Sequence, residues 1–131
     1  MIAPNEIEAR DEVLALGAVS RETEHNAKDL DAYVELLTRW QAKINLVAPA
    51  TLGEIWRRHI LDSAQILSLA PSDARIWVDL GSGAGLPGMV LAILLKDRSG
   101  AEVHLVESDR RKSIFLSEAA RITNAPAKVH L

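Results

Sequence analysis

Two acidic residues and a run of glycines carry the clearest chemistry of this sequence. Asp79 stands near the end of an apolar stretch, Ile76 to Leu80, and is followed by glycines at positions 81, 83 and 85. The apolar stretch predicts a buried β-strand, and the glycines predict a tight turn into a helix that begins near Pro87. Because glycine has no Cβ, the main chain of such a turn can adopt positive φ and lie close to a flat ligand. This stretch therefore predicts a small-ligand site.

The spacing of the glycines bears on which ligand fits. A dinucleotide site is typified by G-x-G-x-x-G, whose last glycine packs the helix under a pyrophosphate. Counted from Gly81, that place is taken by Leu86, so the fingerprint fails. The arrangement Asp79-x-Gly81-x-Gly83-x-Gly85 instead resembles motif I of the S-adenosylmethionine-dependent methyltransferases. Their ligand carries a sulfonium and an amino group but no pyrophosphate, and a carboxylate such as Asp79 suits a partly cationic ligand.

Glu107 is the second acidic residue of the predicted site. It ends the stretch Glu102 to Glu107, which has the pattern of a second strand. An acidic side chain at the carboxyl end of that strand can accept both ribose hydroxyls of a nucleoside. Two plainer alternatives stay open: Glu107 can be the N-terminal residue of the next helix, and glycine turns between strand and helix also occur without ligands.

A basic cluster lies on a third predicted helix, after Pro49. Thr51 and Glu54 form the pattern of a capping box at its start. Arg57 and Arg58 can contact phosphates of a nucleic acid, although a solvated helix face is the commoner place for such residues. His59 lies three residues before Asp62, so the two are neighbours on a helix surface and form either a polar bridge toward the ligand cleft or an exposed ion pair. The exposed pair is the plainer expectation.

Size and composition indicate one soluble domain. The chain has 131 residues, of which 48% are hydrophobic and 25% charged, and no cysteine, so a disulfide framework and a thiolate zinc site are excluded. No apolar run approaches the roughly 20 residues that span a bilayer, and the N-terminus lacks the layout of a signal peptide. We therefore expect a cytoplasmic protein with no metal and no membrane partner. The net charge of −3 means that a nucleic acid would meet a local basic patch.

The pattern of apolar residues divides the chain into two parts. Residues 1–72 predict a helical extension with three helices. They are a helix over 5–16, a second helix that Ser20 can cap, and a third from Thr51 to Pro71. The second helix carries apolar residues at helical spacing from Leu30 to Ile44, among them Tyr33 and Trp40, and these predict a stripe that faces the core. Residues 73–131 alternate as β-α-β-α-β, with strands at 76–80, 102–107 and 127–131 and helices at 87–96 and 109–122. This alternation predicts an α/β fold with a parallel sheet and right-handed crossovers. A third strand that ends at Leu131 leaves the first strand as an unpaired edge, which predicts a truncated sheet.

Three blocks of residues, in order and spacing, resemble the glucose-inhibited division protein B family. They are Trp40-Gln41-Ala42-Lys43-Ile44-Asn45-Leu46, then Arg58-His59-Ile60-Leu61-Asp62-Ser63, then Asp79 to Gly88. The resemblance implies a class I, Rossmann-like methyltransferase fold of which this chain is the N-terminal half, preceded by a helical extension. It also implies S-adenosylmethionine as the methyl donor, the N7 atom of a guanine in 16S ribosomal RNA of the small subunit as the target, and a monomer when full length.

The same resemblance implies roles for individual residues. Gly81 and Leu86 match cofactor-contacting positions, Gly83 and Gly85 complete the loop, and Glu107 matches the acid that binds the ribose. The Arg58-His59 block is a candidate for contacts to RNA or to the cofactor cleft. Family members continue into further strands that hold an adenine-contacting stretch and an arginine. We name no general base, because guanine N7 is already a lone-pair nucleophile and the reaction depends on positioning.

Two other functions stay open on the sequence. A nicotinamide oxidoreductase would use the same strand, turn and helix, and is disfavoured by Leu86 at the place of the third glycine. A module without catalysis would bind RNA or a protein through the helical extension and the exposed sheet edge.

Overall fold

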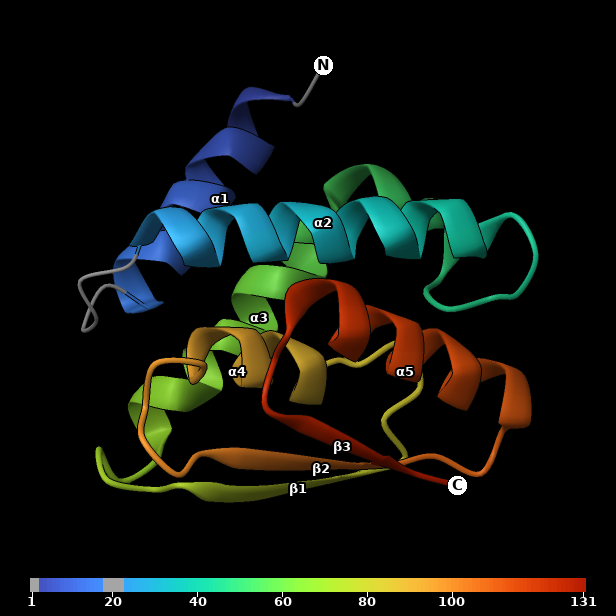
Figure 1. Cartoon of the computed structure of the whole chain (residues 1–131). Coiled ribbons are helices and arrows are strands. Elements are labelled where there is room, and N and C mark those ends of the chain that lie inside the picture. Colours follow the sequence, from blue (N-terminus) through green and yellow to red (C-terminus); the bar gives the residue numbers. More distant parts are fainter. Residues whose placement is uncertain (1–2, 18–22) are drawn as a thin grey trace.

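The computed structural model describes residues 3–17 and 23–131 (Figure 1). The chain begins with two α-helices, α1 (Pro4–Gly17) and α2 (Thr23–Gln41). Four short helical segments follow: η1 (Pro49–Glu54), η2 (Trp56–Ile60), α3 (Leu61–Ala64) and η3 (Gln65–Leu69). The remainder alternates as β1 (Ile76–Leu80), α4 (Gly88–Leu94), β2 (Glu102–Val106), α5 (Arg110–Thr123) and β3 (Ala127–His130). Ser20, expected to cap the second helix, lies outside the described residues.

The three strands form one parallel sheet in the order β1-β2-β3. Val78 pairs with His104, and His104 pairs with Lys128, so the strands run side by side without offset. Helices α4 and α5 make the two crossovers. This confirms the predicted β-α-β-α-β order and the α/β fold class, and the sheet is that of a partial Rossmann-like fold.

The helices lie in layers on one side of this sheet (Figure 1). All seven residues of α4 are buried, because the helix is enclosed between the sheet and the helical extension. Helix α2 covers α4 and α5 with a stripe that includes Leu30, Tyr33 and Leu37, each fully buried. The stripe expected for the second helix is thus confirmed as core. The extension and the β-α-β-α-β part share one hydrophobic core.

The opposite face of the sheet is not covered by any described element. Ile76, Val78 and Leu80 alternate on this face, with 61, 61 and 78% of their surface exposed. The prediction of a buried first strand is therefore wrong for these three side chains, because a strand is buried only where layers cover both of its faces. The expectation that β1 forms an edge of the sheet is confirmed. No helix in the described ranges is long and apolar enough to cross a membrane.

The segment from Pro49 to Leu69 is not the single α-helix that the sequence predicts. It consists of a 3-10 helix, a π-helical turn, one α-helical turn and a second 3-10 helix. The capping box is also wrong: Thr51 lies inside the first 3-10 helix, whose N-cap is Ala48, and Glu54 pairs with Arg58. The interruption of the helix has a tertiary cause, since the buried carboxylate of Glu6 on α1 accepts hydrogen bonds from the backbone N–H groups at the start of η2.

Candidate functional site

The loop between β1 and α4 is fixed from three sides. Val106 O accepts the backbone N–H groups of Gly81 and Ser82 at 2.8 and 3.0 Å, which ties the loop to the end of β2. Glu107 Oε1 accepts the N–H of Gly83 at 2.7 Å. From the helical layer, the hydroxyl of Tyr33 donates to Ala84 O at 2.5 Å. The loop therefore has a defined conformation that both the sheet and the extension support.

The glycines of this loop serve two different purposes. Gly81 and Gly83 have φ of 74° and 55°, and a Cβ at either place would meet nothing closer than 4.0 Å, so the main chain there faces open space. A Cβ on Gly85 would lie 2.7 Å from Met89 Cβ, and one on Gly88 would lie 2.6 Å from Asp79 Oδ2. Gly81 and Gly83 thus leave the main chain open to a ligand, whereas Gly85 and Gly88 allow α4 to pack closely.

Asp79 joins the end of β1 to the start of α4. Its Oδ2 accepts the N–H of Gly88 at 3.0 Å, which satisfies one of the unpaired donors at the helix start. The half-buried carboxylate also faces Tyr33: burial first, and the charge of Asp79 second, raise the pKa of the Tyr33 phenol well above its usual range. Tyr33 therefore stays protonated and keeps its hydrogen for Ala84 O.

Glu107 lies at the carboxyl end of β2, as the sequence predicts, and only 8% of its surface is exposed. Besides Gly83, its carboxylate accepts the N–H of Asp109 through Oε2 at 2.8 Å. Asp109, not Glu107, is the N-cap of α5 and accepts the N–H of Lys112. Each carboxylate oxygen of Glu107 has a second lone pair, so the group retains acceptor capacity toward ribose hydroxyls.

Leu86 is half-buried and follows the glycines of the β1–α4 loop, just before α4. Five of the six predicted cofactor residues, Asp79, Gly81, Gly83, Leu86 and Glu107, therefore lie in one loop and at the two strand ends beside it. Gly85, the sixth, lies in the same loop, where the lack of a Cβ makes room for Met89. A flat ligand with hydroxyl groups fits this arrangement, since it has exposed main chain on one side and a buried carboxylate on the other.

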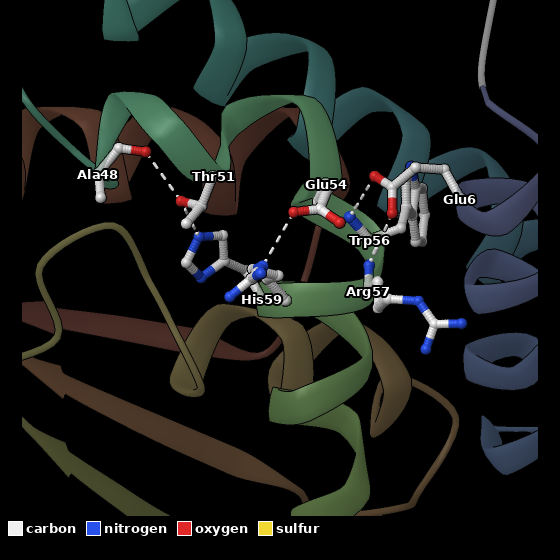
Figure 2. A network of polar contacts seen from close by, with 8 residues as sticks. Glu6, Ala48, Thr51, Glu54, Trp56, Arg57 and His59 are labelled. Atoms are coloured by element: carbon white, nitrogen blue, oxygen red, sulfur yellow. Dashed lines mark hydrogen bonds and ion pairs between the residues drawn. The ribbon is translucent and has the colours of Figure 1, made fainter.

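The basic residues Arg57, Arg58 and His59 lie on the π-helical turn η2 (Figure 2). Arg57 and Arg58 are exposed; Arg58 pairs with Glu54 at 2.9 Å, and Arg57 forms no ion pair within the described residues. Figure 2 shows the side chains of Arg57 and His59 pointing in different directions, so these two do not converge on one point. No hydrogen bond or ion pair joins them to the glycine loop in the part of the chain that the structure describes.

His59 contacts Thr51 and not Asp62, so the expected ion pair is wrong. Thr51 Oγ1 lies 2.8 Å from both Ala48 O and His59 Nε2. Both contacts are satisfied when Thr51 donates to the carbonyl and His59 Nε2–H donates to Thr51, which leaves His59 Nδ1 as an acceptor. Burial lowers the pKa of His59, and the charge of Asp62 only partly offsets this. The result is a neutral imidazole whose Nδ1 acceptor has no hydrogen-bond partner within residues 3–17 and 23–131.

The residue that holds η2 in place was not found from the sequence. Glu6 of α1 is 3% exposed, and its carboxylate accepts the N–H of Trp56 at 2.8 Å and that of Arg57 at 2.9 Å (Figure 2). Tyr33 was likewise expected only as core. A signal existed for Tyr33, because a phenol inside an aliphatic stripe needs a buried partner for its hydroxyl. No local signal existed for Glu6, whose partners lie 50 residues away.

Comparison with known proteins supports the resemblance. The family model described as GidB, rRNA small subunit methyltransferase G, matches residues 26–129. A protein of a Bradyrhizobium species named ribosomal RNA small subunit methyltransferase G is 64% identical over 118 residues, which are 90% of this chain and 51% of that protein. Proteins of the same name from Parvibaculum lavamentivorans and Methylorubrum populi are 57 and 58% identical over 88 and 92% of this chain, and the matches cover 50 and 56% of those proteins.

This chain thus spans about half the length of the curated relatives that it matches. With the family model matching most of the described residues and identities of 57–64%, the chain belongs to the GidB family of rRNA small subunit methyltransferase G.

Proposed function

We propose that this chain is the cofactor-binding half of an rRNA methyltransferase that transfers a methyl group from S-adenosylmethionine to guanine N7 in 16S ribosomal RNA. The observation that carries the proposal is the pairing of Glu107 with Gly83. This hydrogen bond places a buried carboxylate beside the main chain of Gly83, which faces open space. The names of the relatives support rRNA of the small subunit as the substrate class.

The residues of this site fit the proposed donor. Gly81 and Gly83 would lie against its flat part, Leu86 would give an apolar contact, and Glu107 would accept the ribose hydroxyls. Asp79 supplies negative charge near the partly cationic ligand while it holds α4 through Gly88. When bound, S-adenosylmethionine supplies a methyl group on a sulfonium. The sulfur becomes a neutral thioether when the methyl group is transferred.

Catalysis in this proposal is positioning. Guanine N7 has a lone pair, so none of the residues of this site needs to remove a proton. Holding the nucleophile about 3–3.5 Å from the methyl group and in line with it can contribute about 7–11 kcal/mol to lowering the barrier. We assign the holding of the donor to the β1–α4 loop, and contacts to RNA to Arg57, Arg58 and the free acceptor of His59. We further propose a cytoplasmic monomer.

A chimera tests the reaction and its target. This chain would replace the matching 118-residue segment of the Bradyrhizobium relative, whose own remainder completes the protein. We expect the purified chimera to transfer labelled methyl from S-adenosylmethionine to 16S rRNA and to yield 7-methylguanosine on nuclease digestion. A folded chimera that methylates another base, or none while the parent enzyme is active, would contradict the proposal.

A Gly83→Val form of the chimera serves as the site variant. Valine at φ 55° is strained, and its side chain enters the open space in front of the loop, so activity should be lost. Gly53→Ala is the matched control, because Gly53 is exposed and a Cβ there meets nothing within 4 Å.

A further inference from the structure

We propose that a hollow at the end of α2, lined by Leu36, Arg39, Trp40 and Lys43, binds one unpaired nucleobase of single-stranded RNA, with the neighbouring phosphates on Arg39 and Lys43. The hollow has a volume of about 300 Å³. This inference rests on the proposed function only in taking RNA as the substrate class. It concerns a surface on α2, apart from the cofactor loop and from the basic residues of η2.

The floor of the hollow is apolar and aromatic. Leu36 is 4% exposed, and Trp40 is half-buried. The indole of Trp40 packs edge to face on the fully buried ring of Phe115, with ring centroids 5.7 Å apart and planes at 63°. An indole held in this way loses little freedom when a base stacks on it. Any of the four bases can stack on an aromatic side chain, since each base has a π-face.

The turn after α2 places a cation beside this floor. Gln41 Oε1 accepts the N–H groups of Leu46 and Val47, both at 3.1 Å, and its Nε2 donates to Val47 O at 2.9 Å. The turn also holds Lys43, whose N–H donates to Trp40 O at 2.8 Å. The block Trp40 to Leu46, which carries much of the family resemblance, thus has a structural explanation: its glutamine shapes the turn, while its tryptophan and lysine line the hollow.

The charges at the rim suit phosphate groups. Lys43 is exposed and forms no ion pair within the described residues. Arg39 is exposed, and its contact with Glu35, also exposed, is loose at 4.0 Å. A second carboxylate near Arg39, that of Glu118, is paired with Arg121. Two cations beside an aromatic floor are an arrangement that suits single-stranded nucleic acids, which combine phosphate contacts with base stacking.

The hollow lies at the same end of the molecule as the glycine loop. Helices α2 and α5 pack against each other and run in opposite directions, so the end of α2 lies beside the start of α5 (Figure 1). The start of α5 adds three more cations: Arg110, Arg111 and Lys112. Figure 1 shows the carboxyl ends of the three strands at this same end of the molecule. An RNA strand held by the hollow would therefore lie at the end of the molecule that carries the glycine loop.

Fluorescence anisotropy with a labelled ten-nucleotide single-stranded RNA tests this inference, without cofactor. The comparison probe has the same backbone and length but no bases, so it keeps every phosphate contact and removes stacking. We expect the intact RNA to bind about tenfold tighter than the abasic one. Trp40→Leu should weaken binding of the intact RNA about tenfold and leave the abasic probe unchanged, while Trp40→Phe should retain most of the affinity.

The cations are tested in the same assay. Lys43→Gln should weaken binding of both probes and reduce the dependence of log K on log salt by about 0.7, as expected for one lost phosphate contact with a single strand. Lys128→Gln is the matched control, because Lys128 pairs with Glu102 on β2 and lies on the opposite face of the sheet. It should leave both affinities unchanged.

Equal affinity of the two probes for the unaltered chain would overturn the inference, as would unaltered binding by a folded Trp40→Leu chain. Circular dichroism establishes whether that variant folds. If it does not, the probe comparison on the unaltered chain and the exposed substitution Lys43→Gln decide the matter. Because the assay contains no methyl donor, its failure leaves the cofactor site untouched, and failure of the cofactor site leaves this result untouched.

Discussion

Glu107 Oε1 accepts the backbone N–H of Gly83 at 2.7 Å, across 24 residues of sequence. The bond joins the loop after β1 to the residue that follows β2 and fixes the middle of the glycine loop. The charge on Glu107 strengthens it, since hydrogen bonds to ionised groups contribute more than neutral ones. The cofactor loop is therefore held by the same side chain that we propose as its ribose acceptor.

Replacing Glu107 by glutamine should destabilise the chain. The amide keeps one acceptor oxygen but turns an NH₂ toward a backbone N–H, so one buried charged hydrogen bond is lost at about 1.5–3 kcal/mol. Urea unfolding measures this loss. Glu118→Gln is the control, because it removes only an exposed pair with Arg121 that solvent screens, so the stability should change little. Equal stability of the two variants would contradict the role of Glu107.

Replacing Tyr33 by phenylalanine should loosen the loop with little change to the core. The ring still packs on Phe115, but Ala84 O loses its donor, at a cost of about 1–3 kcal/mol for an unsatisfied buried group. Hydrogen exchange should show faster opening of the Gly83 and Gly85 amides. Protection unchanged at both amides would show that the Tyr33 hydroxyl does not support the loop.

Replacing Glu6 by alanine should release α1 from η2. Two backbone N–H groups, those of Trp56 and Arg57, lose a charged acceptor, so their exchange protection should fall sharply. Glu8→Ala, an exposed position on the same helix, is the control and should change neither amide. Retained protection at Trp56 in the Glu6 variant would show that η2 holds itself together.

Acid should destabilise the chain in part through His59. Burial lowers its pKa in the folded state below the ordinary value of about 6.5, so the unfolded state binds the proton more tightly. The stability that the neutral form of His59 contributes to the folded state is therefore fully present above about pH 6.5, and it is lost as the pH falls through the folded-state pKa. Denaturation midpoints from pH 8 to 5 should fall less steeply for His59→Gln than for the unaltered chain. The same pH dependence of the midpoint in both proteins would contradict the lowered pKa of His59.

The local part of this fold follows from the sequence. The change from helical to alternating patterns at Arg75 predicted the β-α-β-α-β order, and the glycines predicted the loop before α4, because both signals depend on residues close together in the chain. The stripe of α2 from Leu30 onward was predicted for the same reason.

The predictions that were wrong involve contacts between residues far apart in the sequence. Thr51 and Glu54 match a capping box, but the acceptor at the helix start is Glu6, so tertiary structure overrides the local signal. The exposed Val78 shows the reverse case: a strand can be apolar enough for burial while no described layer covers it. The roles of Asp79, Glu107 and the glycines as ligand contacts stay predictions that rest on the resemblance and on the geometry of the loop.

Mapping of amide chemical shifts by NMR during titration with S-adenosylmethionine tests the central claim most directly, because it detects weak binding and locates it. We predict that the shifts concentrate on residues 81–86 and Glu107, and that Gly83→Val abolishes them while Gly53→Ala does not. Shifts that concentrate elsewhere, or none at millimolar donor, would contradict the assignment of this loop.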